Sequence, residues 1–401
     1  MRIWPATLEF RSAGKSARNS ARRTVTVSHP TPAMRLFFHV ALLTVAATAF
    51  DSARAADEDA PAYEAILKID VHSHIFEDVA SINELFRRIN VRTINVCVLG
   101  GDGHLELMHR IALDLYRKNP TLYPFTATFD ILGRDQPGYT DKVIAWLDRQ
   151  FALGAVAVKI WKEVGIDIKN REGKFILPDD PLFDPIYAHL AKRGKPLHAH
   201  LAEPIDAWRP LDKDSPHYGY YSQNPQWHMY GKPEFPSHAA IIAARDNIMK
   251  KHPTLVMVGA HLGSLEHDLA GIAERLDRYP NFHIEVAART RNLARHPSEK
   301  VRALFLKYPD RIMYGVDVSW MPHRREQPAT DAQRQGHATM LELRYKSDFD
   351  YYAGAGEMTY NGRKTEALHL PRALLEKFYH TNAERVFKLK PAWSAAPKSG
   401  D

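Results

Sequence analysis

The sequence predicts an α/β fold, a (β/α)8 TIM barrel that forms a single domain with long loops on its catalytic face. Three observations support this prediction. Short apolar runs alternate with amphipathic segments along the chain, and there are eight of each over about 320 residues, as a barrel of this type requires. No G-x-G-x-x-G motif follows the first apolar run, which disfavours the alternative of an open, doubly wound sheet.

Eight apolar runs are short enough to be buried strands of a parallel sheet. They end at Asp70–His74, Val96–Leu99, Tyr123–Thr128, Ala155–Ile160, Pro196–His200, Leu255–Ala260, Phe282–Val286 and Ile312–Val316. The segments between and after them have the spacing of amphipathic helices. These predicted helices cover residues 81–90, 104–118, 139–153, 182–193, 237–251, 265–278, 298–307 and 371–388.

Two long insertions interrupt the pattern, and both follow predicted strands. Ala202–Pro236 is rich in aromatic residues, and Val318–Leu370 follows the last strand. Loops that follow strands lie on the catalytic face of a barrel, so we expect both insertions there. The aromatic side chains of the first insertion fit either a substrate lid or a small hydrophobic cluster beneath a long loop.

The first 55 residues read as a leader rather than as part of the barrel. From Met34 a positive residue precedes a short apolar core, and Ala53-Arg54-Ala55 fits a cleavage site. We therefore expect Met34 to be the true start of a signal peptide, residues 56–390 to form the barrel and residues 391–401 to be a flexible tail. The mature protein is expected to be exported, to the periplasm, without stable membrane insertion after cleavage.

Charge and cysteine content exclude some classes of function. The formal net charge is +7, but the leader alone carries eight Lys and Arg against two acids, so the barrel is nearly neutral. A nearly neutral body without a basic stripe argues against nucleic-acid binding. Cys97 is the only cysteine, so the chain has no intrachain disulfide.

Residues of metal-ligand type follow several predicted strands. His72 and His74 stand two residues apart at the first strand end, and therefore point to the same side. His200, His261 and Asp317 follow later strands. The first and last strands of a closed barrel are neighbours, so His72, His74 and Asp317 can meet, and His200 can reach them across the rim. Three imidazoles and a carboxylate suit Zn²⁺ or another borderline divalent ion.

This donor set predicts an active site. A bound metal would acidify a water molecule, Asp317 could take its proton, and His261 could polarise a carbonyl or bind an oxyanion. Lys159 stands near the end of the fourth strand and remains ambiguous: it is either an ammonium that binds a substrate carboxylate or shifts neighbouring pKa values, or a plain surface residue.

The chain resembles the amidohydrolase superfamily, specifically its amidohydrolase-related (amidohydrolase 2) branch, over residues 65–390. The resemblance is carried by Asp70-Val71-His72-Ser73-His74, by Lys195–Glu203, by Gly259-Ala260-His261-Leu262-Gly263, by Tyr314-Gly315-Val316-Asp317 and by Asn382–Phe387. It implies a (β/α)8 fold, one or two divalent metals, and hydrolysis or, in some members, non-oxidative decarboxylation.

The resemblance also implies roles for single residues. His72, His74, His200 and Asp317 would be metal ligands, and His261 and Asp317 would be catalytic. The family pattern selects His200 rather than His198, which would be a core or supporting residue. One metal per chain is expected, most simply Zn²⁺, or two if Lys159 is carbamylated.

Substrate contacts are expected on the rim. Arg289 follows the seventh strand, where barrel loops often bind anions, and its guanidinium suits a carboxylate. Lys159, Trp161, Glu203 and Trp320 stand after other strands and complete the predicted substrate-binding set.

We expect a metal-dependent hydrolase whose activated water attacks a C–N or C–O bond of a small, carboxylated substrate. A non-oxidative decarboxylase or hydratase on the same barrel is the first alternative, because fold does not fix reaction. A catalytically inactive, exported ligand-binding barrel is the second. The expected partner is a small molecule, with a homo-oligomer as a further option.

Overall fold

The computed structural model describes residues 61–98, 104–131, 133–322 and 327–389. The predicted signal peptide with Met34 and the predicted tail 391–401 lie outside these residues, so both stay predictions. Within the described residues, no helix is long and apolar enough to cross a membrane.

Eight parallel strands form the barrel, and each coincides with a predicted strand. They are β1 (Lys68–Ile75), β2 (Val91–Val96), β3 (Phe125–Thr126), β4 (Val158–Ile160), β5 (Leu197–Ala199), β6 (Met257–Gly259), β7 (Phe282–Glu285) and β8 (Ile312–Met313). They lie in two sheets, of order β3-β2-β1-β9 and β4-β5-β6-β7-β8, where β9 (Val318–Trp320) is an additional strand paired with β1.

Backbone hydrogen bonds join the two sheets at both seams. At one seam Ala127 and Val158 form a parallel bridge between the ends of β3 and β4. At the other, Val71 N donates to Tyr314 O at 3.1 Å and Asp317 N donates to His72 O at 2.7 Å. The second seam brings the end of β8 beside β1. The chain is therefore an α/β TIM barrel, as the sequence predicts.

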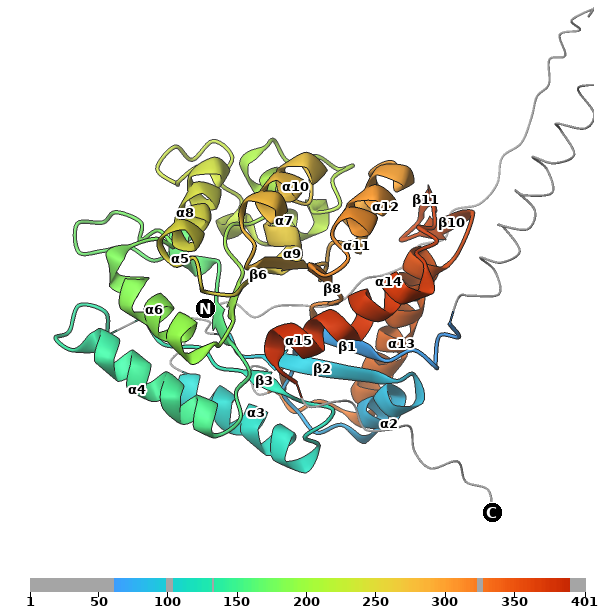
Figure 1. Cartoon of the computed structure of the whole chain (residues 1–401), viewed down its shortest axis with the longest axis horizontal. Coiled ribbons are helices and arrows are strands. Elements are labelled where there is room, and N and C mark those ends of the chain that lie inside the picture. Colours follow the sequence, from blue (N-terminus) through green and yellow to red (C-terminus); the bar gives the residue numbers. More distant parts are fainter. Residues whose placement is uncertain (1–60, 99–103, 132, 323–326, 390–401) are drawn as a thin grey trace, which may run out of the picture. The chain divides into compact units, whose positions relative to one another are not determined.

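Helices surround the strands (Figure 1). The predicted helices are confirmed to within a few residues, as α2 (Ala80–Arg88), α3 (Leu105–Lys118), α4 (Tyr139–Ala152), α6 (Asp184–Arg193), α8 (His238–Lys251), α10 (Leu269–Arg278), α12 (Ser298–Lys307) and the pair α14 (Arg372–Glu376) and α15 (Asn382–Phe387), which are joined by a π-helical turn. Ser237 begins α8 by accepting a hydrogen bond from Ala240 N. Gly194 ends α6 with a φ of 60°.

The insertion Val318–Leu370 is more ordered than the long loop that the sequence predicts. Besides β9 it contains the 23-residue helix α13 (Asp331–Ala353) and the hairpin β10 (Glu357–Tyr360) and β11 (Arg363–Glu366). A capping box on Thr330 and Gln333 starts the helix. The polar first turns of α13 hide it in the sequence, although Ala338, Leu341, Tyr345, Phe349 and Tyr352 keep helical spacing and are buried.

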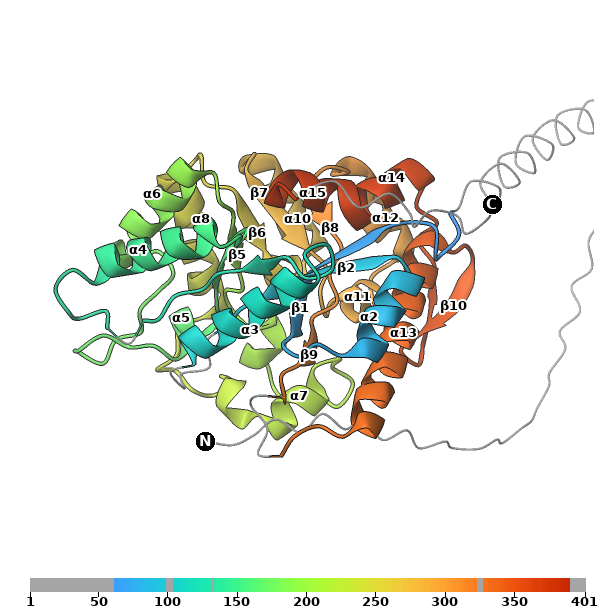
Figure 2. The same ribbon diagram turned by 90° about the horizontal axis from the view of Figure 1, so that it is seen from below.

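Short helical pieces make up the remaining connections. These are α5 (Glu163–Ile166), α7 (Tyr218–Gln223), α9 (Ala260–Gly263), α11 (Thr290–Leu293) and the 3-10 turns Pro181–Phe183, Ile205–Trp208 and Pro225–Trp227. Figure 2 shows α7, from the insertion 202–236, at the opposite end of the barrel from α15.

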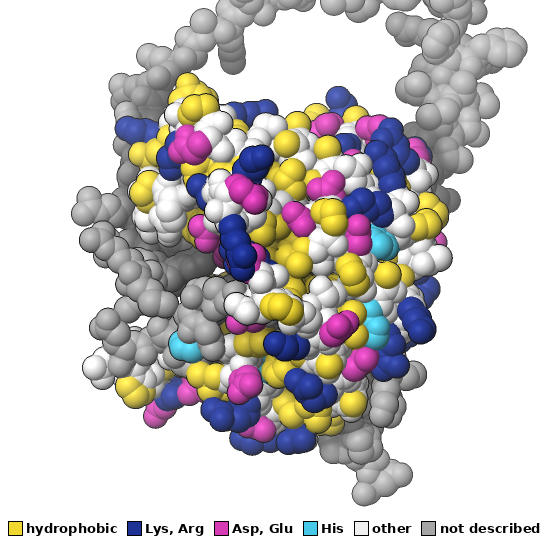
Figure 3. Space-filling view, turned by 90° about the vertical axis from the view of Figure 1, so that its left-hand side faces the viewer, with side chains coloured by type: hydrophobic (Ala, Val, Ile, Leu, Met, Phe, Trp, Pro, Cys, Tyr) yellow, Lys and Arg dark blue, Asp and Glu magenta, His cyan; other side chains and the backbone are white. Residues whose placement is uncertain are grey.

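The barrel interior is apolar at one end. Ile69, Val71, Ile94, Ala157, Val258 and Met313 of the strands pack together, and Ala383, Val386 and Phe387 of α15 close this end. The other end, where the strands terminate, is left for polar side chains. On the face shown in Figure 3, Lys and Arg side chains are interspersed with Asp and Glu, and no broad basic surface is seen.

A buried histidine links α3 to the β3–β4 seam and makes stability depend on pH. His109 accepts a hydrogen bond from Thr128 N on Nε2 (3.0 Å) and donates one from Nδ1 to Leu105 O (2.7 Å), so its ring must be neutral. Burial lowers the pKa of His109 to about 4 from 6.5. Below pH 6.5 the unfolded chain therefore binds a proton at this histidine that the folded chain does not bind. The stabilisation of the folded state by the neutral His109 ring is complete above pH 6.5 and is lost as the pH falls towards 4.

When the pH is lowered from 6.5 to 4, the urea concentration at the unfolding midpoint should decrease in both proteins. We expect a smaller decrease in His109→Gln than in the natural protein. The difference in unfolding free energy should approach roughly 3 kcal/mol at most. The Gln carbonyl can still accept from Thr128 N but does not titrate. Equal acid losses in both proteins would contradict the prediction.

Candidate metal centre

Strained backbone surrounds the carboxyl ends of the second sheet. Ala202, His261, Ala288 and Asp317 follow β5, β6, β7 and β8, and each has a positive φ between 55° and 68°. Such a conformation is costly for residues other than glycine and persists only where the surroundings enforce it, which is most often at functional sites. Two of these residues, His261 and Asp317, are predicted site residues.

His72, His74 and Asp317 come together at this end of the barrel. Asp317 Oδ1 lies 3.3 Å from His74 Nε2 and 3.8 Å from His72 Nε2. The three ligand atoms lie within 4.8 Å of one another, as a shared metal ion would require. β1 supplies both imidazoles, and the seam with β8 supplies the carboxylate.

The hydrogen bonds of these histidines fit a metal site. His72 donates from Nδ1 to Glu285 Oε1 (2.7 Å) and His74 donates from Nδ1 to Val96 O (2.7 Å). The Nδ1 atoms of both rings are thereby engaged as donors, and both Nε2 atoms lie on the side of Asp317. Supporting bonds of this kind orient histidine ligands in metal sites. The residues present therefore fit a divalent metal.

His261 belongs to the same centre, and His200 lies beside it. His261 donates from Nδ1 to Ala287 O (2.8 Å), and its Nε2 lies 3.9 Å from Asp317 Oδ2. The ring of His200 packs 4.3 Å from that of His261, and its Nε2 is buried with no hydrogen-bond partner among the described residues. His200 is thus adjacent to the centre but outside the tight group of three.

Asp317 is ionised in this setting. Burial opposes its ionisation, but His72, His74 and His261 outweigh burial and hold the pKa of Asp317 well below its usual range. Burial in turn lowers the pKa of His72 and of His261, helped by the nearby cations Lys159 and Arg289 respectively. At neutral pH the centre thus presents an ionised Asp317 together with neutral His72 and His261, the protonation states that metal binding needs.

Lys159 is buried inside the centre, which rules out the surface interpretation. Its side chain is 1% exposed, and Nζ lies 3.2 Å from His72 Nε2. Burial lowers the pKa of Lys159 to about 8, while Glu285 and Asp317 oppose this shift. A lysine of this kind is neutral in part of the molecules near neutral pH.

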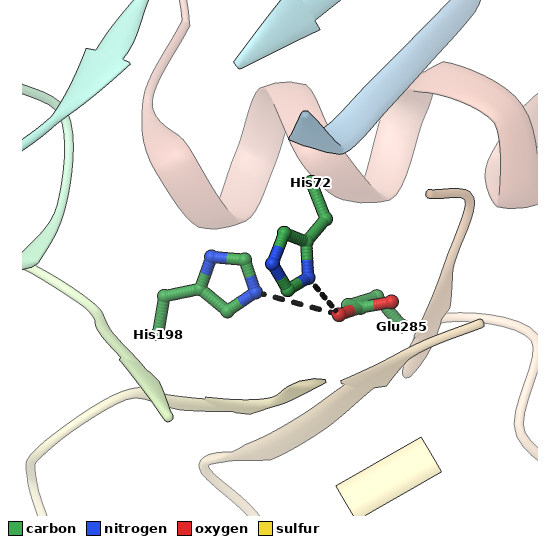
Figure 4. A group of neighbouring side chains, drawn as sticks. All are labelled: His72, His198 and Glu285. Carbon is green, nitrogen blue, oxygen red and sulfur yellow. Dashed lines mark hydrogen bonds and ion pairs between the residues drawn. The ribbon is translucent and has the colours of Figure 1, made fainter. Parts of the chain in front are cut away.

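Glu285 connects the parts of the centre (Figure 4). Its Oε1 accepts from His72 Nδ1 and from His261 N (3.0 Å), and lies 3.5 Å from His198 Nε2. Its Oε2 accepts from Ala287 N. His72, His198 and Glu285 also lie close enough together to hold a metal ion. However, the 2.7 Å contact between His72 Nδ1 and Glu285 Oε1 is a hydrogen bond, which leaves no room for an ion between these two atoms.

A left-handed turn presents His261. His261, Leu262, Gly263 and Ser264 have φ values of 57° to 62°, an arrangement that costs roughly 1–2 kcal/mol for each residue other than glycine. Buried Arg245 of α8 donates to Gly263 O, and Glu285 accepts from His261 N. These two contacts offset the strain and fix the turn.

Three of the predicted substrate-binding residues already have partners within the fold. Trp161 is 4% exposed and packs on Phe129, and Trp320 is buried in β9, where its Nε1 donates to Glu77 (2.7 Å). Glu203 is buried and pairs with Lys162. Each of these three side chains thus has a partner within the fold, and a role for them in substrate binding stays a prediction.

Lys162, next to Trp161, contacts aromatic residues of the insertion 202–236. Its Nζ bonds to Glu203 and to Tyr220 Oη (2.8 Å), and lies 4.1 Å from the centre of the Trp227 ring. Tyr221 Oη also donates to Glu203 (3.1 Å). These polar and cation–π contacts tie the insertion to the rim beside β4, and both interpretations of its aromatic residues stay predictions.

Glu285 and Arg245 both stand outside the site residues that the sequence predicts. A charged residue inside the apolar run of β7 is the signal for Glu285, because a buried carboxylate needs partners. Arg245 gives no comparable signal, since its partner is a backbone carbonyl in a turn whose shape the sequence does not reveal.

The fold and this centre define the class: a (β/α)8 barrel with a metal-ligand set at the carboxyl ends of its strands. A family model described as Amidohydrolase matches residues 121–389. The match covers more than half of the chain, so the chain belongs to this amidohydrolase family, whose members are enzymes. β1, with His72 and His74, precedes the matched range. No curated protein matches the sequence.

Solved structures with a similar arrangement are distant. A 2,6-dihydroxybenzoate decarboxylase from Rhizobium is 15% identical, with 80% of this chain and 99% of that chain covered and a TM-score of 0.47. A manganese complex of 5-carboxyvanillate decarboxylase from Novosphingobium aromaticivorans is 14% identical (82% and 98% covered, TM-score 0.45). Amidohydrolase 2 from Bifidobacterium longum subsp. infantis is 15% identical (81% and 100% covered, TM-score 0.41). At such distances, their reactions and ligands do not transfer to this chain.

Proposed function

We propose that the protein is a divalent-metal-dependent hydrolase that cleaves a C–N or C–O bond of a small, carboxylated molecule. One observation carries the proposal: ionised Asp317 lies 3.3 to 3.9 Å from the Nε2 atoms of three histidines, His72, His74 and His261. His72, His74 and Asp317 would hold the metal, with His200 as a further ligand. The bound metal, Zn²⁺ in this proposal, would supply Lewis acidity and a more acidic water.

The chain's own residues supply the proton transfers and the orientation. Asp317 stays ionised at neutral pH and accepts the proton of the attacking water. His261 is anchored through Nδ1 by Ala287 O and turns its Nε2 to the same space; stabilising a developing negative charge there requires the doubly protonated ring. Lys159 adds positive charge beside His72.

Non-oxidative decarboxylation is the second candidate, and a different feature favours it. Arg289 and Lys159 place buried cationic groups near the centre, where a substrate carboxylate can be held against them. Such a reaction needs a proton donor after CO₂ leaves, and Lys159, with a pKa of about 8, is the group of the centre that can donate at neutral pH. Family membership is compatible with both reactions.

Lys159 also decides between one and two metals. As an ammonium it leaves one site, which is the expectation. Carbamylated, it would become a carboxylate-like ligand, and His200 and His261 would be free to hold a second ion. Burial, which lowers its pKa, favours the neutral amine that such a modification requires.

Metal analysis and product analysis test the proposal together. Purified protein should contain at least one tightly held divalent ion per chain, and dialysis against a chelator should abolish turnover until the ion is restored. Substrates are sought in a panel of carboxylated amides, esters, lactones and aromatic acids. Loss of an amide or ester bond supports hydrolysis, and release of CO₂ supports decarboxylation. Protein that binds no divalent ion when offered Zn²⁺ or Mn²⁺ would refute both.

A further inference from the structure

Two arginine side chains beyond β7 carry buried polar atoms without partners. Arg289 has a side chain that is 7% exposed, and its Nη1 donates to the adjoining Ala288 O, at 3.2 Å. Its Nε has no hydrogen-bond partner among the described residues; Glu266 Oε2 lies 3.8 Å away, an ion pair that is too long for a hydrogen bond, and also lacks a hydrogen-bond partner there. A buried donor left without a partner is costly, so such a group calls for an explanation.

Arg291 repeats this pattern two residues later, in α11. Its Nε is buried and has no hydrogen-bond partner in the described part of the chain, and its Nη2 lies 3.4 Å from His217 Nδ1. His217 is held on its other side by Asn292 Nδ2 at 3.0 Å. Burial lowers the pKa of Arg291 to about 10, and repulsion from the charges of Arg289 and Arg344 adds to this shift. An anion between Arg289 and Arg291 would relieve their repulsion.

These arginines lie between the metal centre and the aromatic insertion. Ala287, whose carbonyl anchors His261, is separated from Arg289 by one residue. The charge of Arg289 contributes to the low pKa of His261, which places the guanidinium within electrostatic reach of the centre. On the opposite side, His217 begins the short helix α7 of the insertion. A ligand held here can therefore reach the centre with another part of its structure.

We propose that Arg289 and Arg291 form an anion subsite for a carboxylate of the substrate that is remote from the bond that reacts. The inference rests on the proposed function and narrows its substrate to molecules with such a remote anionic group. A guanidinium is planar and presents paired donors that match a carboxylate. Glu266, at 3.8 Å, is too far from Arg289 Nε for a hydrogen bond and leaves that donor for a ligand.

Binding of simple anions to the full, metal-loaded chain tests the subsite by calorimetry. The probes are succinate, acetate and inorganic phosphate. We expect succinate to bind, and Arg289→Gln and Arg291→Gln each to weaken it about 10- to 100-fold, the loss of a charge-assisted hydrogen bond. Arg289→Lys keeps the charge and should lose less. Arg278→Gln, at an exposed position of α10, is the matched control and should bind normally.

The outcomes separate the two proposals. Succinate binding that is unchanged in folded Arg289→Gln and Arg291→Gln overturns the subsite, and so does phosphate that displaces succinate and binds more tightly. Unchanged thermal unfolding of Arg289→Lys with weaker succinate binding supports it. If the protein binds no metal, but Arg289→Gln still weakens succinate binding, the subsite is supported and the metal-dependent function is refuted. Normal metal content without any anion binding overturns the subsite and leaves the metal-dependent function standing.

Discussion

Asp317→Asn is expected to lower turnover by about 10²- to 10⁴-fold, the contribution typical of a general base, and to weaken metal binding as well. The variant removes the negative charge that His72, His74 and His261 surround while keeping the size of the side chain. Asparagine also tolerates the left-handed backbone at this position, where φ is 63°, so the turn after β8 should persist. Elemental analysis and turnover of the substrate found by product screening measure the two effects.

Asp310→Asn provides the matched control for Asp317→Asn. Asp310 precedes β8, has a largely exposed side chain and pairs with Lys377 at 2.9 Å, away from the centre. Its replacement should leave metal content and turnover near those of the natural protein, because exposed ion pairs contribute little. Full turnover in Asp317→Asn, with the metal retained, would contradict the role given to this carboxylate.

Glu285→Gln is expected to weaken metal affinity about 10- to 100-fold, although Glu285 is not itself placed as a ligand. The carboxylate orients His72 through Nδ1 and holds the backbone of His261. In glutamine only one end of the side chain can accept, so its NH₂ group must face either these donors or Ala287 N. The mismatch should also cost about 1–3 kcal/mol of stability.

Chelator competition measures the affinity of Glu285→Gln, and thermal unfolding of the metal-free protein measures its stability. Glu299→Gln, on the exposed side of α12, is the control and should match the natural protein in both. A variant that is destabilised but binds metal normally would show that Glu285 supports the fold alone. Weaker binding together with a shifted pH dependence of metal uptake would show that it positions His72.

The barrel could be predicted because its pattern is local. Each strand is a short apolar run bounded by turn residues, and each helix has its own apolar stripe and caps, as Ser237 and Gly194 illustrate. α13 escaped prediction because its first turns are polar, and its buried face is recognised only once the packing surface beneath it is known. Local sequence patterns therefore predict a helix or strand best when its apolar residues extend along its whole length.

The sequence by itself determined the residue types of the centre and the strand ends on which they stand: His72, His74, His200, His261 and Asp317. Only the tertiary structure decided which of them share a point in space, because β1 and β8 meet through ring closure rather than through neighbouring sequence. It also buried Lys159 beside His72 and made Glu285 a common partner of His72 and His261. Hydrogen bonds and burial depend on atoms that are far apart along the chain, and no local pattern records these distances.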